Sequence, residues 1–180
     1  PLFFTLALSL ILAASGCELA TNDTFSFWCG KQLCDWQAQN GTIRPAPTWH
    51  PADHGVELVT DGVSISQVFT PQPPLFGGTP TFYSGECLRV DLVANIIDGA
   101  TLSVGLDFGN DGTIDQQKPF SSAIHWDEQP IALILQQDAS SMRLHFIKTG
   151  GGSAVLGKVS IRFEEDALCT STRNTQNPAP

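Results

Sequence analysis

The sequence predicts an all-β fold, an antiparallel β-sandwich, and three observations indicate it. Apolar and polar residues alternate with a period of two in several windows, Gly-containing turn signals separate these windows, and no window holds a convincing amphipathic helix. Alternation places one face of a strand on a core, whereas an amphipathic helix repeats about every 3.6 residues. Many short strands separated by turns are typical of sandwiches and barrels.

The expected strands run along most of the chain. Alternating patterns predict four of them, at 87–94, 101–108, 142–147 and 155–163. In the last, Val155, Val159, Ile161 and Phe163 are expected on one face. A continuous apolar run at 131–135 predicts a strand buried on both sides, and weaker patterns predict strands at 24–28, 33–37, 55–59 and 63–69. Turns are expected at Asn40-Gly41, Asp61-Gly62, Asp98-Gly99, Asn110-Asp111-Gly112 and 149–152.

Charge narrows the range of partners. The chain has 180 residues and a formal net charge of -9, and residues 1–16 carry no charged side chain. An acidic domain repels phosphate backbones, and nucleic-acid binding needs a basic patch that releases counterions. Nucleic acid is therefore not expected as a partner.

Residues 1–16 form an apolar leader that ends in small residues just before Cys17. The apolar run is shorter than the ~20 residues that span a ~30 Å hydrocarbon core, and it has the length of a signal-peptide core. The segment Ala14-Ser15-Gly16-Cys17 resembles the lipobox of bacterial lipoproteins. This resemblance implies cleavage before Cys17, diacylglycerol on its thiol, and an exported protein anchored to a membrane of the bacterial cell envelope, at the outer membrane or cell surface. The alternative is an ordinary secretory signal, with Cys17 left as a spare thiol.

These features divide the chain into four parts. We expect a lipoprotein signal peptide at 1–16, a short tether at 17–23, a sandwich domain at 24–169 and a flexible tail at 170–180. The tail is expected to fray because it is polar and contains proline.

Lipidation of one of the five cysteines leaves an even set of four, Cys29, Cys34, Cys87 and Cys169. In an exported domain an even set indicates two disulfides, and three pairings are open. We favour Cys29–Cys34, which closes a short loop, and Cys87–Cys169, which ties a mid-chain strand to the C-terminal edge. A zinc or redox centre is the alternative, although the spacing of Cys29 and Cys34 differs from the usual two intervening residues.

The order and length of the expected strands resemble a jelly roll of the galactose-binding-like type, over about residues 25–164. This fold occurs in many carbohydrate-binding modules, so the resemblance implies a jelly-roll sandwich with a carbohydrate ligand. Sandwich folds host many functions, so the argument for a ligand must come from the site itself.

Tryptophan residues with polar neighbours are the best candidates for such a site. Most of the four tryptophans are expected in the core, but Trp49 and Trp126 lie beside polar and turn residues. A flat ring can stack on the apolar face of a sugar, and neighbouring polar groups can orient it. The candidate ligand-binding residues are Trp49, Trp126, His50, Asp53, His125 and Asp127. The alternative is that these rings are core, or part of a protein-interaction patch.

The run from Asp107 to Asp115 crowds oxygen ligands into nine residues. Calcium takes six to eight such oxygens, so Asp107, Asn110, Asp111 and Asp115 are candidate ligands of a structural calcium ion. The alternative is a β-hairpin in which Asn-Asp-Gly supplies positive φ angles. No other cofactor is expected.

Together these features favour a non-enzymatic envelope lipoprotein whose sandwich binds a ligand, with a polysaccharide as the first choice. The sequence contains no Ser-x-x-Lys nucleophile motif and no Gly-x-Ser-x-Gly elbow. A structural lipoprotein that engages an envelope protein is the alternative, and an accessory domain of an unrecognised hydrolase is a third.

Overall fold

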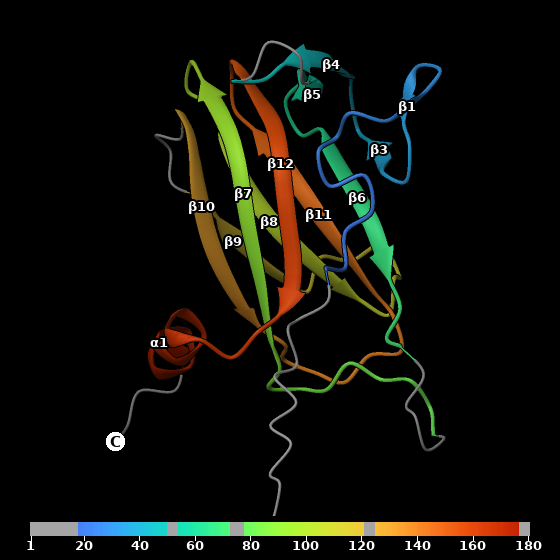
Figure 1. The fold of residues 1–180 in the computed structure, drawn as a ribbon, viewed down its shortest axis with the longest axis vertical. Coiled ribbons are helices and arrows are strands. Elements are labelled where there is room, and N and C mark those ends of the chain that lie inside the picture. The colour runs from blue at the N-terminus through green and yellow to red at the C-terminus, as the bar shows by residue number, and fades with distance from the viewer. Residues whose placement is uncertain (1–17, 50–53, 73–77, 121–124, 177–180) are drawn as a thin grey trace, which may run out of the picture.

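A computed structural model describes residues 18–49, 54–72, 78–120 and 125–176 of the chain. It shows two five-stranded antiparallel sheets packed face to face, with one short helix at the C-terminal side (Figure 1). The predicted all-β sandwich is confirmed. The leader with Cys17, and the site candidates His50 and Asp53, lie outside the described residues.

The first sheet has the strand order β10-β7-β12-β5-β4. Its members are β10 (His125–Ile134), β7 (Cys87–Ile97), β12 (Ser153–Phe163), β5 (His54–Leu58) and β4 (Ile43–Pro47). A bulge between Leu156 and Lys158 interrupts the ladder between β12 and β7. Ala154 and Leu156 before the bulge, and Val159 and Ile161 after it, all join the core. Val155 therefore lies on the outer face, and its predicted place beside Val159 is wrong because the bulge adds one residue to the alternation.

The second sheet has the strand order β3-β6-β11-β8-β9. Its members are β3 (Gln37–Gln39), β6 (Ser64–Phe69), β11 (Met142–Thr149), β8 (Thr101–Phe108) and β9 (Gln116–Pro119). A separate two-stranded hairpin joins β1 (Trp28–Cys29) to β2 (Gln32–Leu33). The turn between β7 and β8 has positive φ at both Asp98 and Gly99, as the predicted Asp-Gly turn requires.

Alternation along the long strands builds the core between the sheets. Leu88, Val90, Leu92 and Ala94 of β7 point inward, and Leu102, Val104 and Leu106 of β8 meet them from the other sheet. An aromatic cluster fills one part of this core, where Phe25, Trp36 and Phe146 lie with ring centroids 5.2–6.4 Å apart. β7, β8 and β11 each keep one face on the core along the predicted alternation, as the period of two requires, whereas β12 changes its inward-facing positions at the bulge.

Two edge strands were not expected, and two expected strands are shorter than predicted. β4 contains Pro45 and Pro47, which lack the N–H for a central ladder, and it lies at a sheet edge where this is tolerated. β9 is polar and lies at the edge of the other sheet. The expected strands at 24–28 and 33–37 reduce to the short β1, β2 and β3, because Phe25 and Asp35 have positive φ and bend the chain there.

The expected flexible tail is instead largely helical. α1 (Ala167–Gln176) begins after Asp166, whose carboxylate accepts a hydrogen bond from the N–H of Cys169 at 2.8 Å. This is the geometry of an N-cap, which stabilises a helix start. The predicted domain boundary at 169 therefore passes through a helix. In the part of the chain that the structure describes, no helix is long and apolar enough to cross a membrane.

The expected tether also belongs to the folded domain from Glu18 onward. The N–H of Leu19 donates to the carbonyl of Ile161 at 2.8 Å, and the Glu18 carboxylate accepts from Ser160 Oγ and the N–H of Ile161. Further along, Gln67 exchanges hydrogen bonds with the backbone and hydroxyl of Thr21. Residues 18–21 are thus fixed on the sandwich rather than forming a loose linker.

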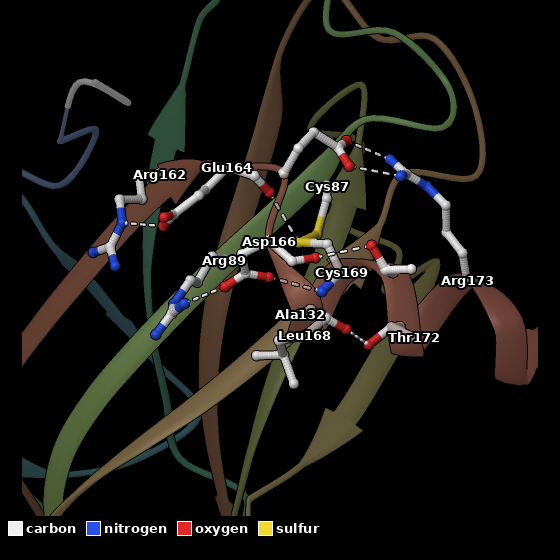
Figure 2. The surroundings of a disulfide bond; sticks show 12 residues. Cys87, Arg89, Ala132, Arg162, Glu164, Asp166, Leu168, Cys169, Thr172 and Arg173 are labelled. Carbon is white, nitrogen blue, oxygen red and sulfur yellow. Dashed lines mark hydrogen bonds and ion pairs between the residues drawn. A yellow bond between two sulfur atoms is a disulfide. The ribbon is translucent and has the colours of Figure 1, made fainter. Parts of the chain in front are cut away.

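Both favoured disulfides are confirmed. Cys29 pairs with Cys34, and Cys87 at the start of β7 pairs with Cys169 in α1. Figure 2 shows the second disulfide at the start of α1, with a set of ion pairs beside it. Asp91, nearly buried, accepts from both Arg89 and Arg162 at 2.9 and 2.8 Å, and Arg89 also pairs with Asp166. The disulfide, α1 and these ion pairs together fix the C-terminal segment to the first sheet.

Candidate functional site

Trp49 and Trp126 lie side by side although 77 positions separate them in the sequence. Trp49 follows β4, and Trp126 is the second residue of β10, on the opposite edge of the first sheet. Their ring centroids are 5.5 Å apart and their planes are inclined by 55°. Both strand ends lie at the end of the sheet opposite α1 (Figure 1). We call these two rings, with Gly157 between their strands, the tryptophan platform.

Gly157 allows the two rings to meet. It is the bulge residue of β12, which occupies the middle of the sheet between the two edges. A Cβ atom added at Gly157 would lie 2.4 Å from Cζ3 of Trp49 and 3.1 Å from Cζ3 of Trp126. The first distance is shorter than any normal contact, so only glycine leaves room for the rings against the strand. The sequence prediction missed Gly157, although an isolated glycine inside a strand pattern is a known sign of a bulge or of a close approach.

The platform differs from the other tryptophans in its exposure. Trp36 is buried in the core and Trp28 packs against it, whereas 47% of Trp49 remains exposed. Trp126 is half-buried and has a φ of 58° at a second bulge, between His125 and Glu128. A non-glycine residue rarely takes this conformation, so the fold holds the ring in place at some cost in free energy. The role of Trp49 and Trp126 in ligand binding stays a prediction.

Polar groups border the platform. His125 is exposed, and its Nδ1 lies 3.0 Å from Oδ1 of Asn95 on β7, which fixes the imidazole beside Trp126. Asp127 and Lys158 are exposed next to the platform residues in sequence. Aromatic rings with fixed polar neighbours can provide a stacking surface together with oriented hydrogen bonds. The arrangement therefore suits a ligand that has both apolar faces and hydroxyl groups.

The four predicted calcium ligands lie at the end of β8 and in the turn that follows it, but each side chain already accepts a hydrogen bond. Asp107 accepts from the N–H groups of Asp111 and Gly112, and Asp115 accepts from the N–H of Phe108. Asp111 accepts from the N–H of Thr113, while Oδ1 of Asn110 accepts from Arg143. Within the described ranges no group of three or more His, Cys, Asp or Glu side chains forms a metal cluster. Calcium binding at this turn stays a prediction, and the backbone hydrogen bonds account for the shape of the turn.

Comparison with known proteins identifies the fold. The sequence matches no protein-family model and no curated protein. Among solved structures, the fold is similar to TmCBM61 in complex with beta-1,4-galactotriose, with a TM-score of 0.57, 10% identity, and coverage of 82% of this chain and 99% of that one. It is also similar to the CBM22-1 xylan-binding domain of Paenibacillus barcinonensis Xyn10C, with a TM-score of 0.53, 14% identity, and coverage of 81% and 94%.

A third similar structure is the enzymatically active domain of tailspike protein 4 from bacteriophage CBA120, with a TM-score of 0.57 and 10% identity. The match covers 82% of this chain but only 21% of that one. At these identities the likeness shows the fold alone. The domain is a jelly-roll β-sandwich of the kind found in carbohydrate-binding modules, as the sequence predicts.

Proposed function

We propose that this domain binds glycans without catalysing a reaction on them, and that the tryptophan platform is the binding site. The single observation that supports this best is the meeting of Trp49 and Trp126 over Gly157 on the outer face of the first sheet. The indole ring of Trp49 is 47% exposed, and the exposed part of the ring adds nothing to the stability of the core. A fold shared with non-catalytic sugar-binding modules supports the same role.

The chemistry of the platform fits a sugar better than a flat protein surface. Two inclined rings offer apolar area to the C–H faces of a pyranose and have few rotamers to freeze, so their ordering costs little free energy. His125, held by Asn95, and the exposed Asp127 supply polar groups at the border. The site is shallow, so we expect dissociation constants in the micromolar to millimolar range, about -4 to -8 kcal/mol.

The test measures binding of the folded domain to soluble galactan, xylan and mixed-linkage glucan by affinity electrophoresis and calorimetry. Trp49→Ala and Trp126→Ala should each weaken binding at least tenfold, which is about 1.4 kcal/mol. Tyr83→Ala is the matched control, since Tyr83 is a 57% exposed aromatic residue away from the platform. Binding that survives both tryptophan substitutions would remove the platform from the site. A folded protein that binds none of the glycans would favour the protein-interaction alternative.

The same proposal includes a lipid anchor on Cys17 in the cell envelope, at the outer membrane or the cell surface. Its support is the Ala14-Ser15-Gly16-Cys17 motif at the end of the leader. Several acyl chains, at about 0.8 kcal/mol per buried CH₂, give stable membrane attachment. Intact-mass analysis of the protein from a bacterial host should show cleavage before Cys17 and added acyl mass, and Cys17→Ser should release the protein from membranes. A mature chain without acyl mass would contradict the anchor and leave the glycan proposal standing.

A further inference from the structure

Arg143 is the one arginine without a carboxylate partner in the described part of the chain. The other four arginines, Arg44, Arg89, Arg162 and Arg173, all form ion pairs with aspartate or glutamate. In a chain with a net charge of -9, carboxylates are abundant, so an arginine without one is unusual. Its position on the outer face of β11 places it on the opposite side of the sandwich from the tryptophan platform.

Neutral oxygen atoms hold the Arg143 guanidinium instead. Nε donates to Oδ1 of Asn110 at 2.5 Å, and Nη1 donates to Oε1 of Gln37 at 2.5 Å and to Oγ of Ser66 at 3.4 Å. Nη2 makes no hydrogen bond to any residue that the structure describes. The amides fix the plane of the guanidinium without neutralising its charge, and they leave donors available for a further acceptor.

His145 lies two residues along the same face of β11 and is also incompletely satisfied. It is 95% buried, and among the described residues its Nε2 atom has no hydrogen-bond partner. Burial, and after it the charge of Arg143, lower the pKa of His145, and a smaller effect of Asp107 raises it. The ring is therefore neutral at pH 7. A buried polar atom without a partner costs about 1–3 kcal/mol and calls for a missing ligand atom or water.

These two residues line a hollow of about 240 Å³ on the outer face of the second sheet. Its other walls are the amides of Gln37, Gln39 and Asn110 with Asp111 and Gly112. The hollow is smaller than the roughly 300–1,000 Å³ of pockets for drug-sized ligands, which suits a single sugar ring. Among the described residues no Trp, Tyr or Phe side chain lines it, so recognition there depends on charge and hydrogen bonds rather than on stacking on a large ring.

We propose that this hollow is a second binding site, specific for a carboxylate-bearing sugar such as a uronic acid residue, with Arg143 as its anion-binding group. A guanidinium binds a carboxylate through strong charge-assisted hydrogen bonds, and no described carboxylate forms an ion pair with Arg143. Two acids lie nearby, and backbone N–H groups offset part of their negative charge. Asp107 accepts two backbone N–H groups, and Asp111 accepts one. The amides of the walls then provide partners for the ring hydroxyls, as amide groups do in polar sites.

The test compares trisaccharides of galacturonic, glucuronic and mannuronic acid with their carboxyl-reduced forms, which differ only at the acidic group. Calorimetry on the whole folded protein should show at least one uronate bound tenfold or more tightly than its reduced form, with an affinity that falls as salt rises. Arg143→Gln should abolish this preference. Asn110→Gly should weaken it several-fold, because Asn110 positions the guanidinium and its φ of 59° suits glycine. The ¹⁵N shift of His145 Nε2 should change when the uronate is added.

Arg44→Gln is the matched control, since it removes one positive charge from the first sheet and leaves the hollow intact. The uronate preference should survive this substitution and also the double substitution of Trp49 and Trp126 by alanine, which separates this proposal from the tryptophan platform. Three results would overturn it: no uronate preferred to its reduced form, a preference that persists in Arg143→Gln, or an equal loss in Arg44→Gln. Melting curves of each variant verify that the fold is retained.

Discussion

On the outer face of the first sheet, apolar side chains are covered at one end and exposed to solvent at the other. At the closed end, defined by Cys87, Ala132, Ile134, Leu168 and Cys169, apolar groups on the outside of β7 and β10 lie beneath α1. At the open end, Trp49 and Trp126 lie against Gly157, and no helix of the described residues covers them. The strand β10 contributes residues to both ends, so membership of this strand does not explain why one end is covered and the other is exposed.

This difference teaches where stability and recognition are located. At the closed end the apolar side chains are buried, and the Cys87–Cys169 disulfide links β7 to α1. Ion pairs lie beside this disulfide (Figure 2). The open end leaves aromatic surface in contact with water and holds Trp126 in an unfavourable backbone conformation. Damage to the closed end should therefore lower stability, and damage to the open end should lower affinity.

The largest expected effect is at the closed end. Replacement of Cys87 and Cys169 by alanine opens a link with a sequence separation of 82, for which loop entropy predicts a loss of about 4 kcal/mol in the free energy of unfolding. The matched control is removal of Cys29–Cys34, with a separation of 5 and a predicted loss of about 2 kcal/mol. Urea unfolding measures both. Equal losses would show that the long link is not what stabilises the closed end.

At the open end, Gly157→Ala should weaken glycan binding at least tenfold, about 1.4 kcal/mol. The new Cβ atom would force the Trp49 ring off the strand, while the free energy of unfolding should change by less than about 1 kcal/mol because that ring can turn into solvent. Calorimetry and melting curves measure the two quantities. Gly151→Ala is the control, since a Cβ there has its nearest contact at 3.8 Å. A large loss of stability with unchanged affinity would reverse the assignment of the two ends.

A smaller effect at the closed end depends on pH. The N–H of Cys169, and then Arg89, hold the pKa of Asp166 below its usual range. Asp166→Ala should cost about 1 kcal/mol as a lost N-cap. Because the folded pKa is lowered, the charge of Asp166 stabilises above the unfolded pKa of about 4, and this contribution is lost as the pH falls below it. Asp166→Asn keeps the capping geometry, so its difference in stability from wild type should shrink below about pH 4 in urea titrations. A difference that is constant with pH would contradict a role for the charge.

The smallest effect lies in the turn after β8, which belongs to neither end. If Asp107, Asn110, Asp111 and Asp115 bind calcium, 1 mM calcium at a dissociation constant near 1 mM would stabilise the fold by about 0.4 kcal/mol. We expect no more than this, because the carboxylates already accept backbone N–H groups. Melting with calcium or EDTA measures it, and Asp111→Ala should remove any difference. A stabilisation above about 1 kcal/mol would instead indicate a high-affinity site.

Sequence patterns predicted the parts of this fold where one physical rule dominates. Strands such as β8 and β11 alternate cleanly because each has one face on the core. The apolar run at 131–135 was predicted to be buried on both sides, and it is, since Ile131 and Leu133 face the core while Ala132 and Ile134 lie beneath α1. The parity of the cysteines and their expected export led to the two disulfides.

Other features depend on distant contacts that no local pattern contains. α1 has a Ser- and Thr-rich sequence without an apolar stripe, and its place is set by a disulfide, a cap and the edge of β10. Gly157 matters because two rings from opposite sheet edges converge on it. Arg143 is unusual because no described carboxylate pairs with it, which can be known only once those carboxylates are placed in space. The predicted residues Trp49 and Trp126 do meet, and His125, next to Trp126 in sequence, is hydrogen-bonded to Asn95, whereas the glycine that permits the meeting needed the structure.

The docking of residues 18–21 on the sandwich determines how far the domain could travel from an anchor. With acyl chains on Cys17, the first residue bound to β12 would be its immediate neighbour, Glu18, and one residue spans only about 3.5 Å. Lipoproteins with long tethers can sample a volume around their attachment point, whereas this domain would have almost no slack. The attached edge of the domain would therefore stay close to the bilayer surface. A glycan could then be bound only if its chain comes within reach of the domain itself, because the link to the anchor would add almost no distance.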